Sequence, residues 1–491
     1  MFRKVLKKMP KSITNNFSQK IQRKISETNI KSLKSIIGPE NVLTESVEGY
    51  TMDWLGQMGY KHGTVVLPRS TTEIQDLLKF CNNEGIKVTP QSGNTSLVDG
   101  AIASDPEEII LSLRKLDKIH AFDPLTEVLS CDAGCILQNL QDHLEPYNYE
   151  TPFDLGARGS CLIGGNVSTM AGGINFVKHG NLRNYIVGLE VVLADGSILD
   201  LRSRSRKDNT GTDLKQLFIG SEGTLGVVTA VDMVCVAKSK HSLVLLTKVE
   251  DFGKVLEITK LAKEEFAVNL NAIEYMDYLS YKIVYETNGD RFNYPFELES
   301  FGEKENLVLL ELGGNDEEFL QKQLEDCISR YEDLFSEAIL AETGTQEQEI
   351  WGIREGVAEA YNKAEGYVLK YDFSIDINLF EESCEYFRDL LGPRAEQVSG
   401  YGHIGDGNIH VNIILNERDF CVEETKQLFE PKFMEYIVKN RGSISAEHGI
   451  GLAKAKYLKS QKDPKVLKKM WDLKNLFDPK GILNSNKILQ K

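Results

Sequence analysis

Three glycine-rich segments, set among short β-branched runs, restrict the fold of this chain more than any other feature. They read PQSGNTSLVDG (90–100), LGARGSCLIGGNVSTMAGGINFVKHG (155–180) and LFIGSEGTLG (217–226). Glycine tolerates positive φ angles and lets backbone N–H groups approach a ligand closely, as a loop around a pyrophosphate requires. An ordinary tight turn explains any one such segment, but three together favour a nucleotide-binding loop system in a β-rich domain.

The spacing of these glycines disfavours two common nucleotide-binding folds. GSEGTLG (220–226) departs from Gly-x-Gly-x-x-Gly and runs into a strand-like stretch, so it does not predict a Rossmann NAD site. The sequence also has no Gly-x-x-x-x-Gly-Lys-Ser/Thr and therefore no P-loop. Small polar side chains in the three segments could add hydrogen-bond donors, namely Ser92, Asn94, Thr95, Ser96, Asn166, Ser168, Thr169 and Ser221.

Local sequence patterns predict two domains that differ in their secondary-structure content. Residues 63–236 are rich in strand-like runs, and Ala-Asp-Gly at 194–196 separates two of them as a hairpin signal. Residues 70–85 read as an amphipathic helix opened by a hydroxyl cap and closed by Gly85.

After about residue 240 the pattern changes. Charged helical segments such as 249–266 and 316–338 alternate with strands such as 306–312, which predicts a second, α+β domain. A basic helical tail follows it.

The charge of the chain is unevenly distributed. The formal net charge is −16, yet residues 1–26 carry eight Lys or Arg and no acid. A basic, hydroxylated leader without a long apolar core predicts a mitochondrial presequence, with a disordered basic tail as the alternative. The remaining chain has 49 basic and 73 acidic residues, a net charge of −24, which makes nucleic acid and anionic lipid poor partners.

Two further compositional points bound the fold. No run of about 18 apolar residues occurs, so a transmembrane segment is not expected. The eight cysteines form no Cys-x-x-Cys pair and suit free, mostly buried thiols in a reducing compartment.

Two of the eight histidines flank a turn in YGHIGDGNIHVN (401–412). If Asp406-Gly407 forms a two-residue hairpin turn, His403 pairs directly with His410 across the strands. Their Cβ atoms would then lie about 4.5–5.5 Å apart, a chelating distance, with Asn412 on the same face as His410.

A third ligand for a metal could come from SISAEHGIG (443–451), which places Glu447 beside His448. Two imidazoles and a carboxylate with open positions favour zinc or a similar divalent ion in a catalytic site. The alternative is a hydrogen-bonded pair of structural histidines.

Two cations in WGIREGVAEAYNKAEGYVLKYDFSI (351–375), Arg354 and Lys370, lie sixteen residues apart around a helix and the start of a strand. An arginine can hold a carboxylate bidentately, and a lysine adds a point charge. For an arbitrary pair, solubility at the surface is the simpler explanation.

The order of these motifs resembles the FAD-binding flavoproteins of the vanillyl-alcohol oxidase and glycolate oxidase type. The resemblance is carried by PRSTTEI, PQSGNTSLVDG, DLGARGSCLIGGNVSTMAGGINFVKHGNLRN and DLKQLFIGSEGTLGVVTAV, and by W-x-x-R-E and Y-V-x-K-Y-D further on. It covers the chain from about residue 45.

The resemblance implies an α+β protein with a two-part FAD-binding domain of the vanillyl-alcohol oxidase type. We expect a presequence and linker at 1–35, the FAD-binding domain at 45–240 and a substrate (cap) domain with the metal-binding hairpin at 241–445. A C-terminal helical segment at 446–491 would complete the active site.

The resemblance also implies the cofactor contacts. Residues 92–96 would bind the FAD pyrophosphate, and parts of 159–173 and 222–228 would line the rest. Asn94 stands where covalent members have a flavin-linking histidine, so the FAD should be non-covalent, and Ser92 and Asp99 replace glycines common in relatives. The expected FAD-binding residues are Ser92, Gly93, Asn94, Thr95, Ser96, Gly159, Ser160, Gly164, Gly165, Asn166, Thr169, Gly172, Gly173, Glu222, Gly223 and Val228.

For the active site, the resemblance implies oxidation of a D-2-hydroxy acid. His403, His410 and Glu447 correspond to the metal ligands, and His448 to the catalytic base that also contacts substrate. Arg354 and Lys370 would hold the substrate carboxylates, and Asn412 would orient the acid. Ala358 stands where relatives carry a hydroxyl one turn after the arginine.

The expected reaction transfers a hydride from D-2-hydroxyglutarate to FAD, with D-lactate or another D-2-hydroxy acid as the alternative substrate. The resemblance further suggests the electron-transfer flavoprotein as acceptor, a mitochondrial matrix location and possible homodimerisation.

Overall fold

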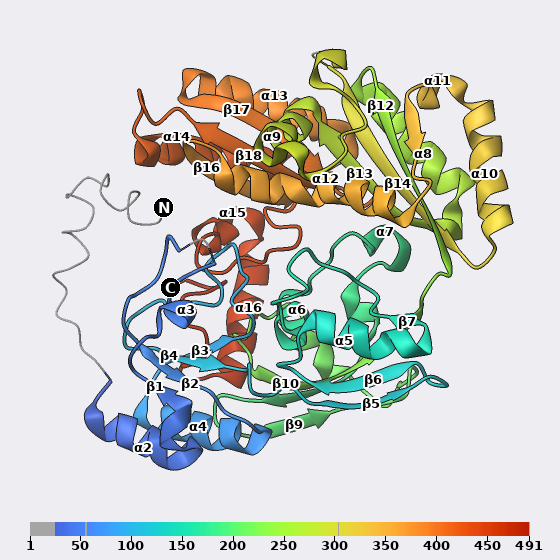
Figure 1. Ribbon diagram of the computed structural model, residues 1–491. Helices are drawn as coiled ribbons and strands as arrows, with labels where there is room; N and C mark the ends of the chain where they lie inside the picture. Colours follow the sequence, from blue (N-terminus) through green and yellow to red (C-terminus); the bar gives the residue numbers. More distant parts are fainter. Residues whose placement is uncertain (1–24, 55, 303, 491) are drawn as a thin grey trace.

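The computed structural model describes residues 25–54, 56–302 and 304–490. The basic part of the predicted presequence, residues 1–24, lies outside the described residues. The chain enters through α2 (Glu27–Ile37), which is capped by Ser26 and buries Leu33 and Ile37. Figure 1 shows two layers of structure, with the strands of residues 241–415 above those of the first half of the chain.

A four-stranded sheet begins the lower layer, in the order β1 (Val42–Leu43), β2 (Thr64–Val66), β4 (Ile109–Ser112) and β3 (Val88–Gln91). The β2–β4–β3 pairs are parallel, and α3 (Glu48–Thr51) precedes β2. The predicted helix at 70–85 is confirmed as α4 (Thr71–Glu84). Ser70 accepts from the Glu73 N–H at its start, and Gly85 ends it with a φ of 68°.

A five-stranded antiparallel sheet completes this layer. Its order is β5 (Ile119–Asp123), β6 (Val128–Asp132), β10 (Val227–Val234), β8 (Ile186–Val192) and β9 (Ile198–Leu201). Val192 pairs with Ile198, which confirms the hairpin predicted at Ala-Asp-Gly. This part of the chain also forms three helices, α5 (Leu137–Leu144), α6 (Ile163–Thr169) and α7 (Phe176–His179). It further forms a two-stranded sheet of β7 (Tyr149–Glu150) and β11 (Val236–Ala237). Both sheets share one core, to which Leu78, Leu111, Leu129 and Val191 belong.

The upper layer is a seven-stranded antiparallel sheet. Its order is β15 (Ala338–Leu340), β12 (His241–Val249), β14 (Asn306–Gly314), β13 (Leu270–Asp277), β17 (Ala395–Gly402), β18 (Asn408–Leu415) and β16 (Tyr367–Ser374). One core joins it to α8 (Phe252–Glu265), α10 (Glu317–Arg330), α11 (Glu332–Phe335), α13 (Phe380–Leu391) and α14 (Val422–Lys439). A separate core joins it to α9 (Tyr278–Asn288) and α12 (Gly344–Lys363).

The last fifty residues return to the lower layer through α15 (Leu458–Gln461) and α16 (Pro464–Phe477). Leu483 bridges to Val88 in parallel, and the buried Lys474 donates to the Thr224 carbonyl. The segment that carries Glu447 and His448 is therefore held between the two layers. Among the described residues, no helix is both long and apolar enough to cross a membrane. All eight cysteines are free, and seven of them are buried, as predicted.

Candidate active site

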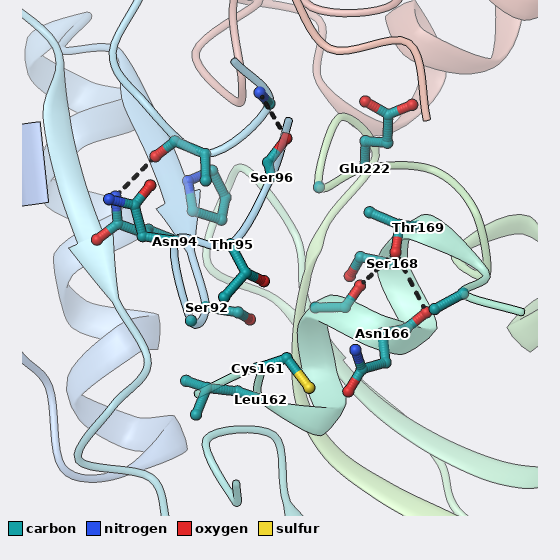
Figure 2. A pocket seen from close by; sticks show the side chains of 18 of the residues that line it. Ser92, Asn94, Thr95, Ser96, Cys161, Leu162, Asn166, Ser168, Thr169 and Glu222 are labelled. Atoms are coloured by element: carbon teal, nitrogen blue, oxygen red, sulfur yellow. Dashed lines mark hydrogen bonds between the residues drawn. The ribbon is translucent and has the colours of Figure 1, made fainter. Parts of the chain in front are cut away.

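The three glycine-rich segments surround one cavity, on which Glu447 and His448 also border. Figure 2 shows the side chains of the first segment facing those of α6 across the open space, with Glu222 at one end. Of the predicted FAD-binding residues, the following line it: Ser92, Gly93, Asn94, Thr95, Ser96, Gly165, Asn166, Thr169, Glu222, Gly223 and Val228. The cavity is therefore built from segments about 130 residues apart in sequence.

Glycine is required where these loops meet. A Cβ atom on Gly93 would lie 2.3 Å from the Ser160 carbonyl oxygen, and one on Gly165 would lie 2.7 Å from the Ser92 Cβ. These contacts are far below van der Waals distance, so side chains at either position would push the loops apart. The loops thereby expose backbone to the cavity.

Several side chains that were predicted to donate hydrogen bonds to a ligand donate to backbone carbonyls of the protein instead. Ser168 and Thr169 donate to the carbonyls of Gly164 and Gly165 within α6. Asn94 has a φ of 56° and donates to the carbonyls of Gly49 and Met52. Its side chain is a structural tie, and contact with a cofactor at this position would have to come from the backbone.

The cavity fits a flavin nucleotide. Small polar residues gather at 92–96, while Leu113, Leu155, Leu162 and Val227 add an apolar wall suited to a ring system. Buried Asn166 Oδ1 and Gln91 Oε1 have no hydrogen-bond partner within the protein and can take donors from a ligand. The apolar wall was not predicted, because buried aliphatic residues have no motif.

Five predicted residues do not border the cavity. Ser160 packs against Gly93, and Gly164 packs against Ala133. Gly172 and Gly173 contact Glu447, to whose Oε1 the Gly173 N–H donates over 2.6 Å. A Cβ on Gly159 would meet no atom within 4 Å.

The predicted register of the histidine hairpin is wrong. His410 pairs with Tyr401, two residues away from the expected partner His403. Strand β17 ends at Gly402, and residues 403–407 form a five-residue loop in which the Asp406 N–H donates to the His403 carbonyl. The loop is held by Asp406, whose Oδ1 also accepts the Asn408 N–H, and within it His403 Nδ1 bonds the buried Glu274.

The two histidines nevertheless meet, because the loop folds His403 back over the sheet. Their ring centroids are 5.6 Å apart, and ligand atoms of His403, His410 and Glu447 lie within 4.8 Å of one another. His403 Nε2 faces Glu447 Oε1 at 3.6 Å. This donor set of two imidazoles and one carboxylate fits a zinc-like ion with open positions.

The protonation of the two rings differs. Burial lowers the pKa of His403, but the Glu274 carboxylate outweighs burial and raises that pKa to about 9. Burial holds the pKa of His410 well below its ordinary value, despite the attraction of Asp372. His410 is therefore neutral and has a lone pair to offer.

A second overlapping cluster, Asp372, His410 and His448, also brings its ligand atoms within 4.8 Å. Asp372 is poorly suited to bind a metal because Oδ2 accepts the backbone N–H groups of residues 446, 447 and 448. Lys454, His410 and His448 outweigh the effect of its burial and hold its pKa well below the ordinary range. Asp372, which was not predicted, orients the Glu447–His448 turn.

The predicted substrate anchors lie on neighbouring elements. Arg354 of α12 is buried, donates to Glu274 Oε2 over 2.8 Å and stacks on the Tyr401 ring. Lys370 pairs with Asn412 across β16 and β18, and its Nζ donates to the Ala358 carbonyl. Burial lowers the pKa of Lys370 to about 8.

Arg354 has further N–H groups beyond those that face Glu274. Its Nη2 lies 2.6 Å from Glu274 Oε2 and is paired with that carboxylate. A guanidinium carries five N–H donors, so the groups that do not face Glu274 can donate to acceptor oxygens of a ligand. His448 stacks over His410 at 6.0 Å and borders the cavity.

Residues 63–202 match the family described as "FAD binding domain", and residues 238–488 match "FAD linked oxidases, C-terminal domain". The chain is 39% identical to "Probable D-2-hydroxyglutarate dehydrogenase, mitochondrial" of Oryza sativa subsp. japonica, over 95% of this chain and 82% of that protein. It is 40% identical to "D-2-hydroxyglutarate dehydrogenase, mitochondrial" of Danio rerio, over 89% and 80%.

A relative with another name is also similar. "Putative D-lactate dehydrogenase C713.03, mitochondrial" of Schizosaccharomyces pombe is 35% identical over 94% of this chain and 90% of that protein. Among solved structures, p-cresol methylhydroxylase with substrate bound superposes with a TM-score of 0.72. The match covers 94% of this chain and 96% of that one at 16% identity, and it confirms the predicted fold class.

Proposed function

The chain belongs to the D-2-hydroxyglutarate dehydrogenase family of FAD-linked oxidoreductases, and on that premise we propose that it oxidises D-2-hydroxyglutarate to 2-oxoglutarate. One observation carries the proposal. Glu274 joins Arg354 of α12 to His403 of a His-His-Glu cluster whose Glu447 borders the cavity, and the second cation, Lys370, donates to the Ala358 carbonyl of the same helix. A substrate with two carboxylates and a hydroxyl matches that arrangement.

When bound, FAD supplies the hydride acceptor, and a divalent ion, zinc in our proposal, supplies a Lewis acid that lowers the pKa of the substrate hydroxyl. The residues lining the cavity would hold the FAD without a covalent link. His403, His410 and Glu447 would hold the ion. The ligand atoms of these three side chains lie within 4.8 Å of one another, which supports these roles.

His448 acts as the base in this proposal. It accepts the proton of the C2 hydroxyl at a ring nitrogen as the C2 hydride leaves. The ring borders the cavity beside Glu447, and its Nδ1 lies 3.8 Å from Asp372 Oδ2. The buried Asp372 anion would stabilise the imidazolium that forms.

In this proposal the substrate is positioned by Arg354, Lys370 and Asn412. The Arg354 N–H groups that do not face Glu274 and the Asn412 amide would donate to substrate oxygens, and the Lys370 ammonium would add a second cation. Such positioning converts binding energy into correct orientation of C2 toward the flavin. Arg158 of the lower layer forms an ion pair with Glu355, the neighbour of Arg354 in α12.

The proposal also includes the cellular location, the electron acceptor and the assembly of the protein. The relatives named above are called mitochondrial, and the basic leader supports a mitochondrial matrix location for this chain. We further propose the electron-transfer flavoprotein as acceptor and a homodimer as assembly. Reduction of purified electron-transfer flavoprotein by enzyme and substrate tests the acceptor, and sedimentation tests the assembly.

The second candidate is a D-lactate dehydrogenase, favoured by the name of the S. pombe relative. D-lactate has a single carboxylate and needs only one cationic anchor. Steady-state kcat/KM values for D-2-hydroxyglutarate, D-malate and D-lactate separate the candidates. We expect D-2-hydroxyglutarate to give the highest value, and a preference for D-lactate would overturn the proposal.

A further inference from the structure

A single buried carboxylate contacts both halves of the candidate site. Glu274 lies in β13 within the run AIEYM (272–276), and its side chain is 1% exposed. Oε1 lies 2.6 Å from His403 Nδ1. Oε2 accepts from Arg354 Nε at 2.8 Å and lies 2.6 Å from Nη2. One oxygen therefore serves a candidate metal ligand, and the other serves a candidate substrate anchor.

The contact with His403 fixes the ring for metal binding. A carboxylate only accepts, so the Nδ1 proton points to Glu274 and leaves Nε2 to face Glu447, 3.6 Å away. Hydrogen bonds of this kind orient histidine ligands and raise their basicity.

The contact with Arg354 fixes the guanidinium for carboxylate binding. The group is held between Glu274 Oε2 and the face of Tyr401, whose ring centroid is 4.8 Å from Cζ. A guanidinium has five N–H donors, and Glu274 occupies only one edge of it. The guanidinium N–H groups that do not face Glu274 are thereby held in a fixed direction and can donate to a carboxylate.

We propose that Glu274 is a positioning residue that sets the metal ligand His403 and the substrate anchor Arg354 in register with each other. This inference rests on the proposed function. A substrate must bring its hydroxyl to the ion and its carboxylate to Arg354 at the same time. A rigid carboxylate between the two fixes the spacing between these contacts, which neither residue could fix alone.

The test is the substitution Glu274→Gln, which keeps the shape of the side chain but removes its negative charge and one of its two acceptor oxygens. Zinc affinity is measured without substrate by competition with a chromophoric chelator, and KM for D-2-hydroxyglutarate is measured at saturating zinc. We expect about 10- to 100-fold weaker zinc binding, as for loss of other outer-shell partners. We also expect KM to rise at least about 10-fold although the metal is present, since a charged hydrogen bond is disturbed.

Glu311→Gln is the matched control. Glu311 lies in the adjacent strand β14, opposite Ala272, and also divides its oxygens between two donors, Asn271 and Trp351. It touches neither His403 nor Arg354 in any hydrogen bond, so both constants should stay within about twofold of wild type. Should Glu274→Gln fail to fold, Glu274→Asp withdraws the carboxylate by one methylene, and both constants should shift in the same directions.

Weaker zinc binding with an unchanged KM at saturating zinc would overturn the proposal, as would no change in either constant. The wild-type protein distinguishes these results from a failure of the proposed function. If the proposed function were wrong, the wild-type protein itself would bind no zinc or would not oxidise D-2-hydroxyglutarate. An active, zinc-binding wild type with a fully functional Glu274→Gln variant would contradict only the role of Glu274.

Discussion

The ammonium group of Lys370 donates to the carbonyl oxygen of Ala358, 2.8 Å away and one helical turn beyond Arg354 in α12. Four residues of helix rise about 6 Å, so the two cations are anchored a short distance apart along one helix face. A backbone carbonyl thus orients Lys370 at the position where a hydroxyl side chain was expected in relatives. The proposed substrate site would then have two cationic anchors without that hydroxyl.

Replacing Lys370→Met should impair dicarboxylate substrates selectively. We expect KM for D-2-hydroxyglutarate to rise about 10- to 100-fold, since a contact with a charged group contributes about 1.5–3 kcal/mol. We expect a smaller effect on the KM for D-lactate, because its single carboxylate can bind Arg354. Steady-state kinetics with both substrates check this, and an equal loss with both would contradict the role of Lys370.

The pH dependence should reveal the same lysine. Burial lowers the pKa of Lys370 to about 8, so the free enzyme loses this positive charge as the pH rises through 8. Because only the protonated lysine attracts a carboxylate, kcat/KM for D-2-hydroxyglutarate should fall above pH 8. Lys370→Arg keeps its charge, and its profile should lack this fall; an unchanged profile in that variant would assign the titration to another group.

Removal of the metal should abolish turnover but leave FAD in place. The ligand cluster lies at the edge of the cavity, so chelation need not disturb the nucleotide loops. His410→Ala should purify without bound metal and with less than about 1% of wild-type activity, which zinc does not restore. His120→Ala is the control, because this ring lies at the surface and bonds Asp132. Full activity in a preparation shown to be metal-free would refute catalysis by the ion.

The glycine contacts predict which loop residues FAD binding tolerates. Gly93→Ala places a methyl 2.3 Å from the Ser160 carbonyl, so the loops must separate, and overpacking of this kind costs about 1–3 kcal/mol. We expect this variant to lose most of its FAD on purification. Gly159→Ala meets no atom within 4 Å and should keep its flavin. The ratio of flavin to protein absorbance checks both, and equal losses would contradict the assigned geometry.

Local signals were sufficient to predict local structure. The cap at Ser70 and Gly85 predicted α4, and Ala-Asp-Gly predicted the hairpin of β8 and β9, because each depends on residues close in sequence. The three glycine-rich segments predicted a common ligand cavity, and the structure brings them together. The resemblance to a known family supplied the roles of these residues.

Long-range contacts were beyond such reasoning. Asp-Gly favours a two-residue turn, but residues 403–407 form a five-residue loop, the register shifts by two, and His403 bonds Glu274, 129 residues earlier. No spacing or turn signal assigns a role to Asp372 or Glu274, each of which shares its strand with other polar residues. Only the fold shows that each buried carboxylate collects donors from distant segments. Glu222 likewise borders the cavity while its carboxylate binds the N–H groups of residues 450 and 451.

The central claim is that a flavin in the cavity takes a hydride from an acid held by Arg354 and Lys370. Its most direct test is the flavin absorbance of the purified holoenzyme during anaerobic mixing with D-2-hydroxyglutarate, L-2-hydroxyglutarate or D-lactate. The account predicts rapid bleaching of the oxidised flavin band by D-2-hydroxyglutarate, with one 2-oxoglutarate formed per flavin. It predicts no bleaching by the L-enantiomer and much slower bleaching by D-lactate. A flavin that stays oxidised with D-2-hydroxyglutarate, or is bleached faster by D-lactate, would contradict it.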